Sequence, residues 1–128
     1  MPHNEDFIDR FTTAERAVRT LELRQRPYFE TVIVGGEFDS STEIPPFFTP
    51  FGGEIVVVYY QTLNGEADIE CYTQSDVSPF VSFTVDPTAA STDLEIPKGL
   101  AEGDRVYTVI ADDDGSCTGL SVGYVIEL

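Results

Sequence analysis

Residues 54–73 read EIVVVYYQTL, then Asn64-Gly65, then EADIECYT, and this stretch decides the expected fold. The run Glu54–Leu63 is β-branched and aromatic, and its middle is apolar on both faces, which predicts a central strand covered on both sides. Asn64-Gly65 is the strongest hairpin signal in the chain. The following stretch alternates, with Ala67, Ile69 and Cys71 on one face and Asp68, Glu70 and Tyr72 on the other.

Similar short runs occur along most of the chain. They are Tyr28–Val34, Phe80–Val85, Leu94–Ile96, Arg105–Ala111 and Cys117–Leu128. Residues 86–93 read as a polar loop, and the Pro- and Gly-rich residues 45–53 cannot form a regular central strand. Seven or eight short strands in about a hundred residues predict a mainly β domain at 27–128, an antiparallel β-sandwich of jelly-roll type.

Residues 1–26 have a helical pattern. Apolar residues recur at spacings of four and three, at Phe7, Phe11, Ala14, Val18 and Leu21, which is the a/d seam of a coiled coil. Arg10 and Glu15 occupy flanking g and e positions suited to an ion pair between chains. We interpret the segment as an oligomerisation or docking helix; the alternative is a helix that packs on its own domain. Two and a half heptads are too short to hold partners alone.

The charge is strongly negative and unevenly distributed. The chain of 128 residues carries 23 acidic against seven basic residues, a net charge of −16. Residues 1–26 sum to zero, so the acidic excess lies in 27–128, opposed there only by Lys98 and Arg105. Such a protein is repelled by nucleic acid and by anionic membranes, so we expect neither as a partner. Dispersed acids with a single lysine favour a halophilic surface over an ordinary acidic domain.

Residues for catalysis are scarce. His3 is the only histidine and lies at the N-terminus, which leaves the hydroxyl and thiol groups of the domain without a histidine base. The chain has no glycine-rich phosphate loop. We therefore expect a non-enzymatic protein without a cofactor. Cys71 and Cys117 are expected as two buried thiols, with a disulfide as the alternative.

Two stretches are candidate ligand sites. Asp112, Asp113 and Asp114 offer oxygen ligands for Ca²⁺, although they lack EF-hand spacing, and we favour a solvated acidic turn. Phe47, Phe48 and Phe51 lie in a loop framed by Pro and Gly and are candidates for a partner patch or a sugar platform. The interpretation we favour for these rings is a plug at one end of the sandwich.

A helix followed by a sandwich resembles the small structural proteins of tailed viruses. The likeness rests on the seam from Phe7 to Leu21, which runs into TLELRQRPYF, and on the closing stretch from Phe80 onward. That closing stretch also looks like the end of a carbohydrate-module jelly roll, where a P-x-GL-x-x-GD turn precedes the last hairpin. Pro97, Gly99, Leu100, Gly103 and Asp104 form this turn here. With the acidic surface, the resemblance implies a virus of a halophilic archaeon.

The sequence thus leads to two functional hypotheses. The first is a structural protein of the virion, a homotrimer assembled in the host cytoplasm, displayed on capsid or tail and in contact with other virion proteins. The second is a carbohydrate-binding β-sandwich that recognises host-surface glycans.

Overall fold

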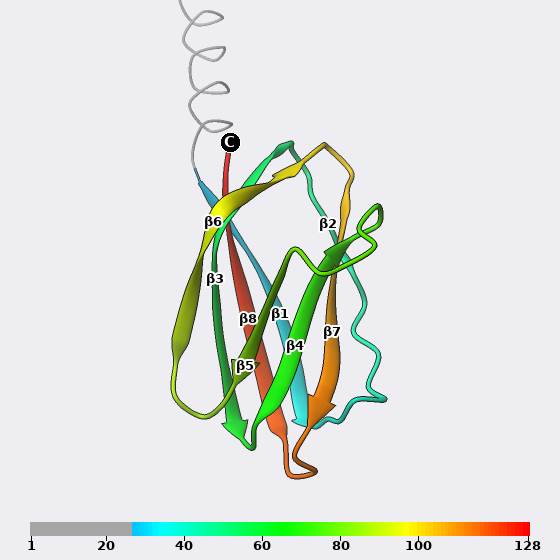
Figure 1. The fold of residues 1–128 in the computed structure, drawn as a ribbon, viewed down its shortest axis with the longest axis vertical. Helices are drawn as coiled ribbons and strands as arrows, with labels where there is room; N and C mark the ends of the chain where they lie inside the picture. Colours follow the sequence, from blue (N-terminus) through cyan, green and yellow to red (C-terminus); the bar gives the residue numbers. More distant parts are fainter. Residues whose placement is uncertain (1–26) are drawn as a thin grey trace, which may run out of the picture.

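The computed structural model describes residues 27–128, which form eight β-strands and no helix (Figure 1). The strands are β1 (Tyr28–Glu37), β2 (Phe47–Phe48), β3 (Gly53–Asn64), β4 (Ala67–Thr73), β5 (Val81–Val85), β6 (Ala90–Leu100), β7 (Arg105–Asp113) and β8 (Thr118–Glu127). In this described part, no helix has the length and apolar character needed to cross a bilayer. The predicted N-terminal helix, its seam and the Arg10–Glu15 pair lie outside the described residues.

The strands form two four-stranded antiparallel sheets, in the orders β1-β8-β3-β6 and β2-β7-β4-β5. Among the described strands, only β4 and β5 are both consecutive in the chain and paired. Every other connection passes from one sheet to the other, which is the nested arrangement of a jelly roll. The predicted antiparallel β-sandwich is therefore confirmed.

The core lies between the two sheets and is lined by alternate residues of each strand. The inward side chains of β8 are fully buried: Leu120, Val122, Tyr124 and Ile126. Ile55 and Val58 of neighbouring β3 lie beside them in the same sheet. Ile69 of β4 and Val106 of β7 face them from the opposite sheet. Central strands with one face toward the core and alternating outward residues explain the period-two pattern of the sequence.

The predicted hairpin at Asn64-Gly65 is wrong, although the turn itself is present. β3 and β4 flank this turn but belong to different sheets. Gly65 has φ +82° and packs against the backbone of Cys117, while Asn64 Nδ2 donates to the carbonyl of Ser116 at 3.0 Å. The turn therefore packs on the β7–β8 connection. β3 forms its hydrogen-bonded ladders with β6 and β8, not with β4. The last predicted hairpin is corrected in the same way, since β7 and β8 also lie in different sheets.

The boundaries of β6 also differ from the prediction. The stretch predicted as a polar loop at 86–93 contributes Ala90–Asp93 to β6, where these residues pair with Val57–Tyr60 of β3. β6 is an edge strand, so its polar side chains stay in solvent while its backbone completes the ladder of β3. Backbone pairing supplied by a neighbour therefore overrides the low strand propensity of this stretch.

Candidate functional site

Two tyrosines lie side by side on the outer face of the β2-β7-β4-β5 sheet. Tyr72 of β4 is directly opposite Tyr107 of β7 in the strand register, and both side chains are half-buried. The Cβ atoms of opposed residues in an antiparallel pair lie about 5 Å apart, so these two residues are neighbours on this face. We call this surface, together with the outward residues of β4 and β5 beside it, the tyrosine face.

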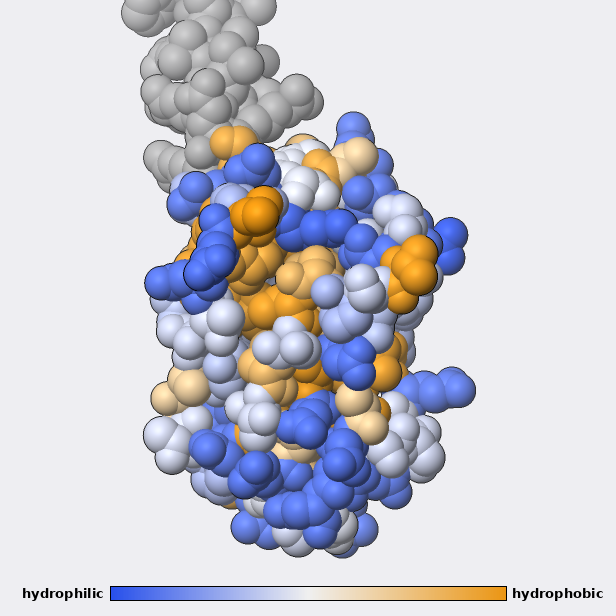
Figure 2. Space-filling model, in the orientation of Figure 1, coloured by the Kyte–Doolittle hydropathy of each residue, from blue (hydrophilic) through white to orange (hydrophobic). Residues whose placement is uncertain are grey.

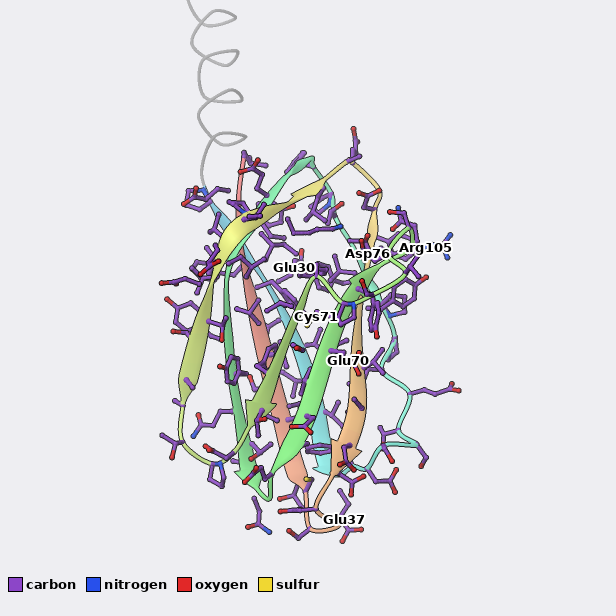
Figure 3. The ribbon with its side chains drawn as sticks, in the orientation of Figure 1. Glu30, Glu37, Glu70, Cys71, Asp76 and Arg105 are labelled. Atoms are coloured by element: carbon purple, nitrogen blue, oxygen red, sulfur yellow. The ribbon has the colours of Figure 1, made fainter. Side chains whose placement is uncertain are left out.

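A shallow depression on the same face is lined by Glu70, which accepts a hydrogen bond from the hydroxyl of Tyr72. It has a volume of about 460 Å³ and lies between β4 and β5, with Asp68, Glu70, Ser82 and Thr84 among its lining residues. Figure 3 shows Glu70 beside β4 in the middle of this sheet. The depression therefore brings carboxylates and hydroxyls next to an aromatic surface.

The carboxylates of the depression are oriented by hydrogen bonds. Thr84 Oγ1 donates to Asp68 Oδ1 at 2.8 Å, and the hydroxyl of Tyr72 donates to Glu70 Oε2. The bond to Glu70 raises the pKa of Tyr72 above its ordinary value, because it stabilises the protonated phenol. A carboxylate has about four acceptor sites, so each of these groups can still accept hydrogen bonds from a ligand.

Arg105 lies at the end of the tyrosine face near the start of β7, where Gln74 bonds to its backbone and to Asp104. Gln74 Nε2 donates to Asp104 Oδ1 at 2.7 Å, and Gln74 Oε1 accepts from the backbone N–H of Arg105 at 2.9 Å. The guanidinium of Arg105 lies 5.8 Å from the ring centroid of Phe48, a cation–π contact. Arg105 is labelled in Figure 3 at this end of the sheet.

The three phenylalanines considered as a candidate patch, although a plug was favoured, do not lie together on one surface. Phe47 packs inward against Tyr124, with ring centroids 5.2 Å apart, as expected of a plug. Phe48 is 60% exposed beside Arg105, and Phe51 contacts Tyr28 edge to face. Adjacent strand residues alternate between faces, so Phe47 and Phe48 of β2 point in opposite directions.

The acidic run Asp112–Asp114 has structural roles in the turn. Asp113 Oδ2 accepts from the backbone N–H of Ser40 at 2.8 Å, and Asp114 accepts from the backbone N–H groups of Glu66 and Ser116, both at 2.9 Å. These bonds lower the pKa of Asp114 to about 2, because they stabilise its charged form. Within residues 27–128, no cluster of acidic residues, cysteines and histidines is arranged to hold a metal ion. Figure 2 shows that hydrophilic side chains cover this end of the domain.

Both cysteines are buried free thiols, as favoured from the sequence. Burial raises the pKa of Cys71 to about 12, and its Sγ lies 3.0 Å from the hydroxyl of Tyr124 in the core. Cys117 lies in the β7–β8 connection, where its Sγ is 3.2 Å from the carbonyl of Glu66. A thiol held in the protonated form and away from solvent is a weak nucleophile, which fits a structural role.

The pairing of the two tyrosines could not be recognised from the sequence. The alternation of Asp68, Glu70 and Tyr72 on one face is confirmed by the structure. Tyr107, however, lies far along the chain, and only the β4–β7 pairing places it opposite Tyr72. The sequence does indicate that Tyr107 points outward, because Arg105, Tyr107 and Val109 alternate with buried residues in β7.

No family model matches the sequence, and no curated protein matches it. Among solved structures, a GH26-CBM35 β-(1,4)-mannanase from Podospora anserina is similar over 82% of this chain, at 11% identity and a TM-score of 0.47. The chain spans only 28% of that protein. The C-terminal CBM6 of a marine laminarinase from Zobellia galactanivorans is similar over 74% of this chain and 98% of its own length, at 6% identity and a TM-score of 0.39. A chain of the T13 IBDV viral particle is similar over 80% of this chain and 31% of its own, at 12% identity and a TM-score of 0.31. These TM-scores are below 0.5, and we draw no functional conclusion from them.

Proposed function

We propose that the domain is a carbohydrate-binding module that recognises a neutral glycan on its tyrosine face. The observation that carries this proposal is the opposed pair Tyr72–Tyr107 beside a depression that contains the carboxylates of Asp68 and Glu70. Aromatic rings offer a flat apolar surface to the C–H face of a sugar ring. Oriented carboxylates and hydroxyls accept and donate the hydrogen bonds that fix its hydroxyl groups.

The charge of the domain limits the class of glycan. A chain with a net charge of −16 repels sulfated, phosphorylated or uronic-acid sugars, and carboxylates in the depression add local repulsion. Neutral sugars carry many hydroxyl donors for which Asp68 and Glu70 are good acceptors. A neutral oligosaccharide is therefore the ligand that this surface fits best.

The same carboxylates are poorly placed for hydrolysis. Asp68 and Glu70 are two residues apart on β4, so both rise from the same face of one strand. Glycosidases place their two carboxyl groups on opposite sides of the scissile bond. Asp68 and Glu70 instead contact a ligand from one side, which supports binding without cleavage.

The test is binding of the full chain to a panel of neutral polysaccharides and oligosaccharides in molar salt, followed by calorimetry on the ligands found. Tyr107→Ala is expected to weaken binding at least about tenfold, because truncation of a central aromatic anchor costs about 1.4 kcal/mol or more. Tyr59→Ala is the matched control, since Tyr59 is a tyrosine 52% exposed on the outer face of the other sheet. Thermal melts confirm that each variant is folded.

Two results would overturn the proposal. One is the absence of binding across the panel. The other is binding that survives Tyr107→Ala and Tyr72→Ala but is lost in Tyr59→Ala, which would place the glycan on the opposite sheet.

A second function, that of an oligomeric virion structural protein, stays a proposal based on the seam at 1–26 and on the resemblance described above. One structural observation favours its oligomeric part, because apolar side chains are exposed on the outer face of the β1-β8-β3-β6 sheet. The test is solution mass by light scattering for the full chain and for a chain that starts at Tyr28. A trimer that becomes a monomer on truncation supports this proposal, and a full-length monomer contradicts it.

A further inference from the structure

The outer face of the β1-β8-β3-β6 sheet is uncharged over the central parts of its three neighbouring strands β1, β8 and β3. Exposed Glu37, Glu54 and Glu127 lie at the strand ends, and Asp93 of β6 lies opposite Val57. All outward residues within 29–33, 57–63 and 119–125 are apolar or neutral. Phe29, Ile33 and Leu63 are 69%, 73% and 80% exposed, and Tyr59 is 52% exposed. We call this surface the uncharged face. It lies on the opposite side of the sandwich from the tyrosine face.

The absence of acids from this face is notable in this chain. Acidic residues make up 23 of 128 positions, and the whole net charge of −16 lies in residues 27–128. Two copies of such a domain repel each other wherever acidic surfaces meet, because like charges placed opposite each other across an interface are unfavourable. The uncharged face is therefore the surface through which two copies can approach. A basic partner would instead be expected to use the acidic surfaces.

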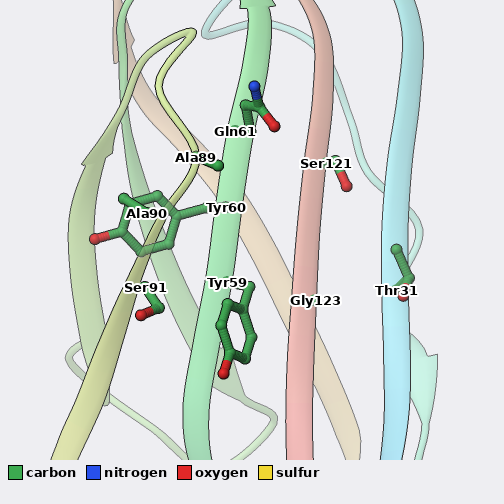
Figure 4. A pocket seen from close by; sticks show the side chains of 9 residues that line it. All are labelled: Thr31, Tyr59, Tyr60, Gln61, Ala89, Ala90, Ser91, Ser121 and Gly123. Carbon is green, nitrogen blue, oxygen red and sulfur yellow. The ribbon is translucent and has the colours of Figure 1, made fainter.

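The uncharged face has both a depression and a protruding side chain, a shape that suits contact with a second copy of the same face. A depression of about 420 Å³ lies over Gly123, with Tyr59 and Gln61 of β3 on one side and Thr31 of β1 on the other (Figure 4). Gly123 keeps its floor low because it has no side chain; an added Cβ would make an ordinary van der Waals contact with Tyr59 Cβ at 3.9 Å. Ile33 lies opposite Ser121 at the rim and protrudes into solvent. Each copy thus presents both an apolar projection and a neutral depression.

We propose that the uncharged face is the contact surface for a second copy of this chain, packed face to face about a twofold axis. In such an isologous contact both partners use the same patch. The projection of each copy can then pack into the depression of the other. The core of an interface is typically depleted of charged residues, as this face is. The tyrosine faces of the two copies then point away from each other and stay open.

The size of the face predicts how strong this contact is. Seven residues of a strand span about 24 Å, and strands are about 4.8 Å apart, so three strands give roughly 350 Å² per copy. Stable interfaces bury about 800 Å² per partner. The face alone therefore supports a weak, concentration-dependent contact. It can supply contact area in addition to the seam predicted from the sequence at residues 7–21.

The test is sedimentation equilibrium of the full chain in molar salt over a range of protein concentrations. We expect self-association with a dimer as a populated species. Ile33→Glu should raise the dissociation constant at least about tenfold, because it places a charge in a desolvated contact. Ile96→Glu is the matched control, since Ile96 is 86% exposed on β6, outside the uncharged face, and it should leave the constant within about twofold.

Leu63→Glu gives a second, independent variant on β3, and circular dichroism confirms that each variant is folded. A protein that is monomeric at all concentrations would overturn the proposal. So would an oligomer whose dissociation constant is unchanged by both Ile33→Glu and Leu63→Glu, or a trimer as the only associated species.

Discussion

The hydroxyl of Tyr124 lies 2.6 Å from Oγ1 of Thr108 and thereby joins the two sheets across the centre of the core. Tyr124 is on β8, Thr108 is on β7, and both are buried. Cys71 of β4 lies 3.0 Å from the same hydroxyl. In the described residues, every buried side-chain nitrogen and oxygen has a hydrogen-bond partner, and this contact is part of the reason.

Tyr124→Phe should therefore destabilise the domain. The substitution keeps the ring but leaves the hydroxyl of Thr108 without its partner, and a buried unsatisfied polar group costs about 1–3 kcal/mol. Urea denaturation measures the change in the free energy of unfolding. The double variant Tyr124→Phe with Thr108→Val removes both partners and should recover much of the loss; a double variant as unstable as the sum of the single ones would contradict this account.

Gly65→Ala should be strongly destabilising. Gly65 has φ +82°, and an added Cβ would lie 2.7 Å from the backbone Cα of Cys117, which cannot move without shifting the β7–β8 connection. We expect a loss of about 2 kcal/mol or more in the free energy of unfolding. Gly115→Ala is the matched control, because Gly115 has φ +83° but no atom within 4 Å of the added Cβ. Equal losses in the two variants would show that the contact with Cys117 is unimportant.

Asp114→Asn should destabilise the protein at neutral pH but have little effect in strong acid. The pKa of Asp114 is lowered to about 2 in the folded state, from an ordinary value of 3.8. A lowered pKa contributes stability above the unfolded value and loses it as the pH falls through the folded value. Melting temperatures of both proteins should thus differ above about pH 4 and converge toward pH 2. Glu102→Gln, which removes one exposed negative charge elsewhere, controls for the general reduction in repulsion. A difference that persists unchanged at pH 2 would refute the carboxylate's role.

Cys71 should resist alkylation in the folded protein. Its side chain is fully buried and its pKa is raised to about 12, so the reactive thiolate is rare at mildly alkaline pH. Mass spectrometry after iodoacetamide treatment should show two modified cysteines in denaturant and no rapid modification of Cys71 without it. Rapid labelling of Cys71 in the native protein would mean that β4 opens readily.

Several features of the fold could be predicted from local patterns. The alternation in residues 66–73 correctly separates inward Ile69 and Cys71 from outward Glu70 and Tyr72, because a strand exposes its residues to opposite faces in turn. The turn at Gly65 and the irregular, Pro-rich stretch before β3 were also predictable from residue type. Residues 1–26 and their seam stay a prediction.

The partners of each strand could not be predicted in this way. β3 was expected to be central, and it lies between β8 and β6, but its outward residue Tyr59 is 52% exposed rather than covered within the domain. The sequence also suggested that β3 and β4 pair through Asn64-Gly65, whereas the turn crosses between sheets. A tight turn specifies a reversal of direction and leaves open whether the two strands hydrogen-bond or pack face to face.

The sequence by itself determined the strand content, the face that each strand presents to the core, and the acidic character of the surface. These properties depend on residue type and on a period of two, which are local. The tertiary structure alone decided that Tyr72 lies opposite Tyr107, that Phe47 and Phe48 point to opposite faces, and that the central outward residues of β1, β8 and β3 form one uncharged face. Each of these depends on pairing between strands distant in the chain, which is set by how all the apolar faces are buried together.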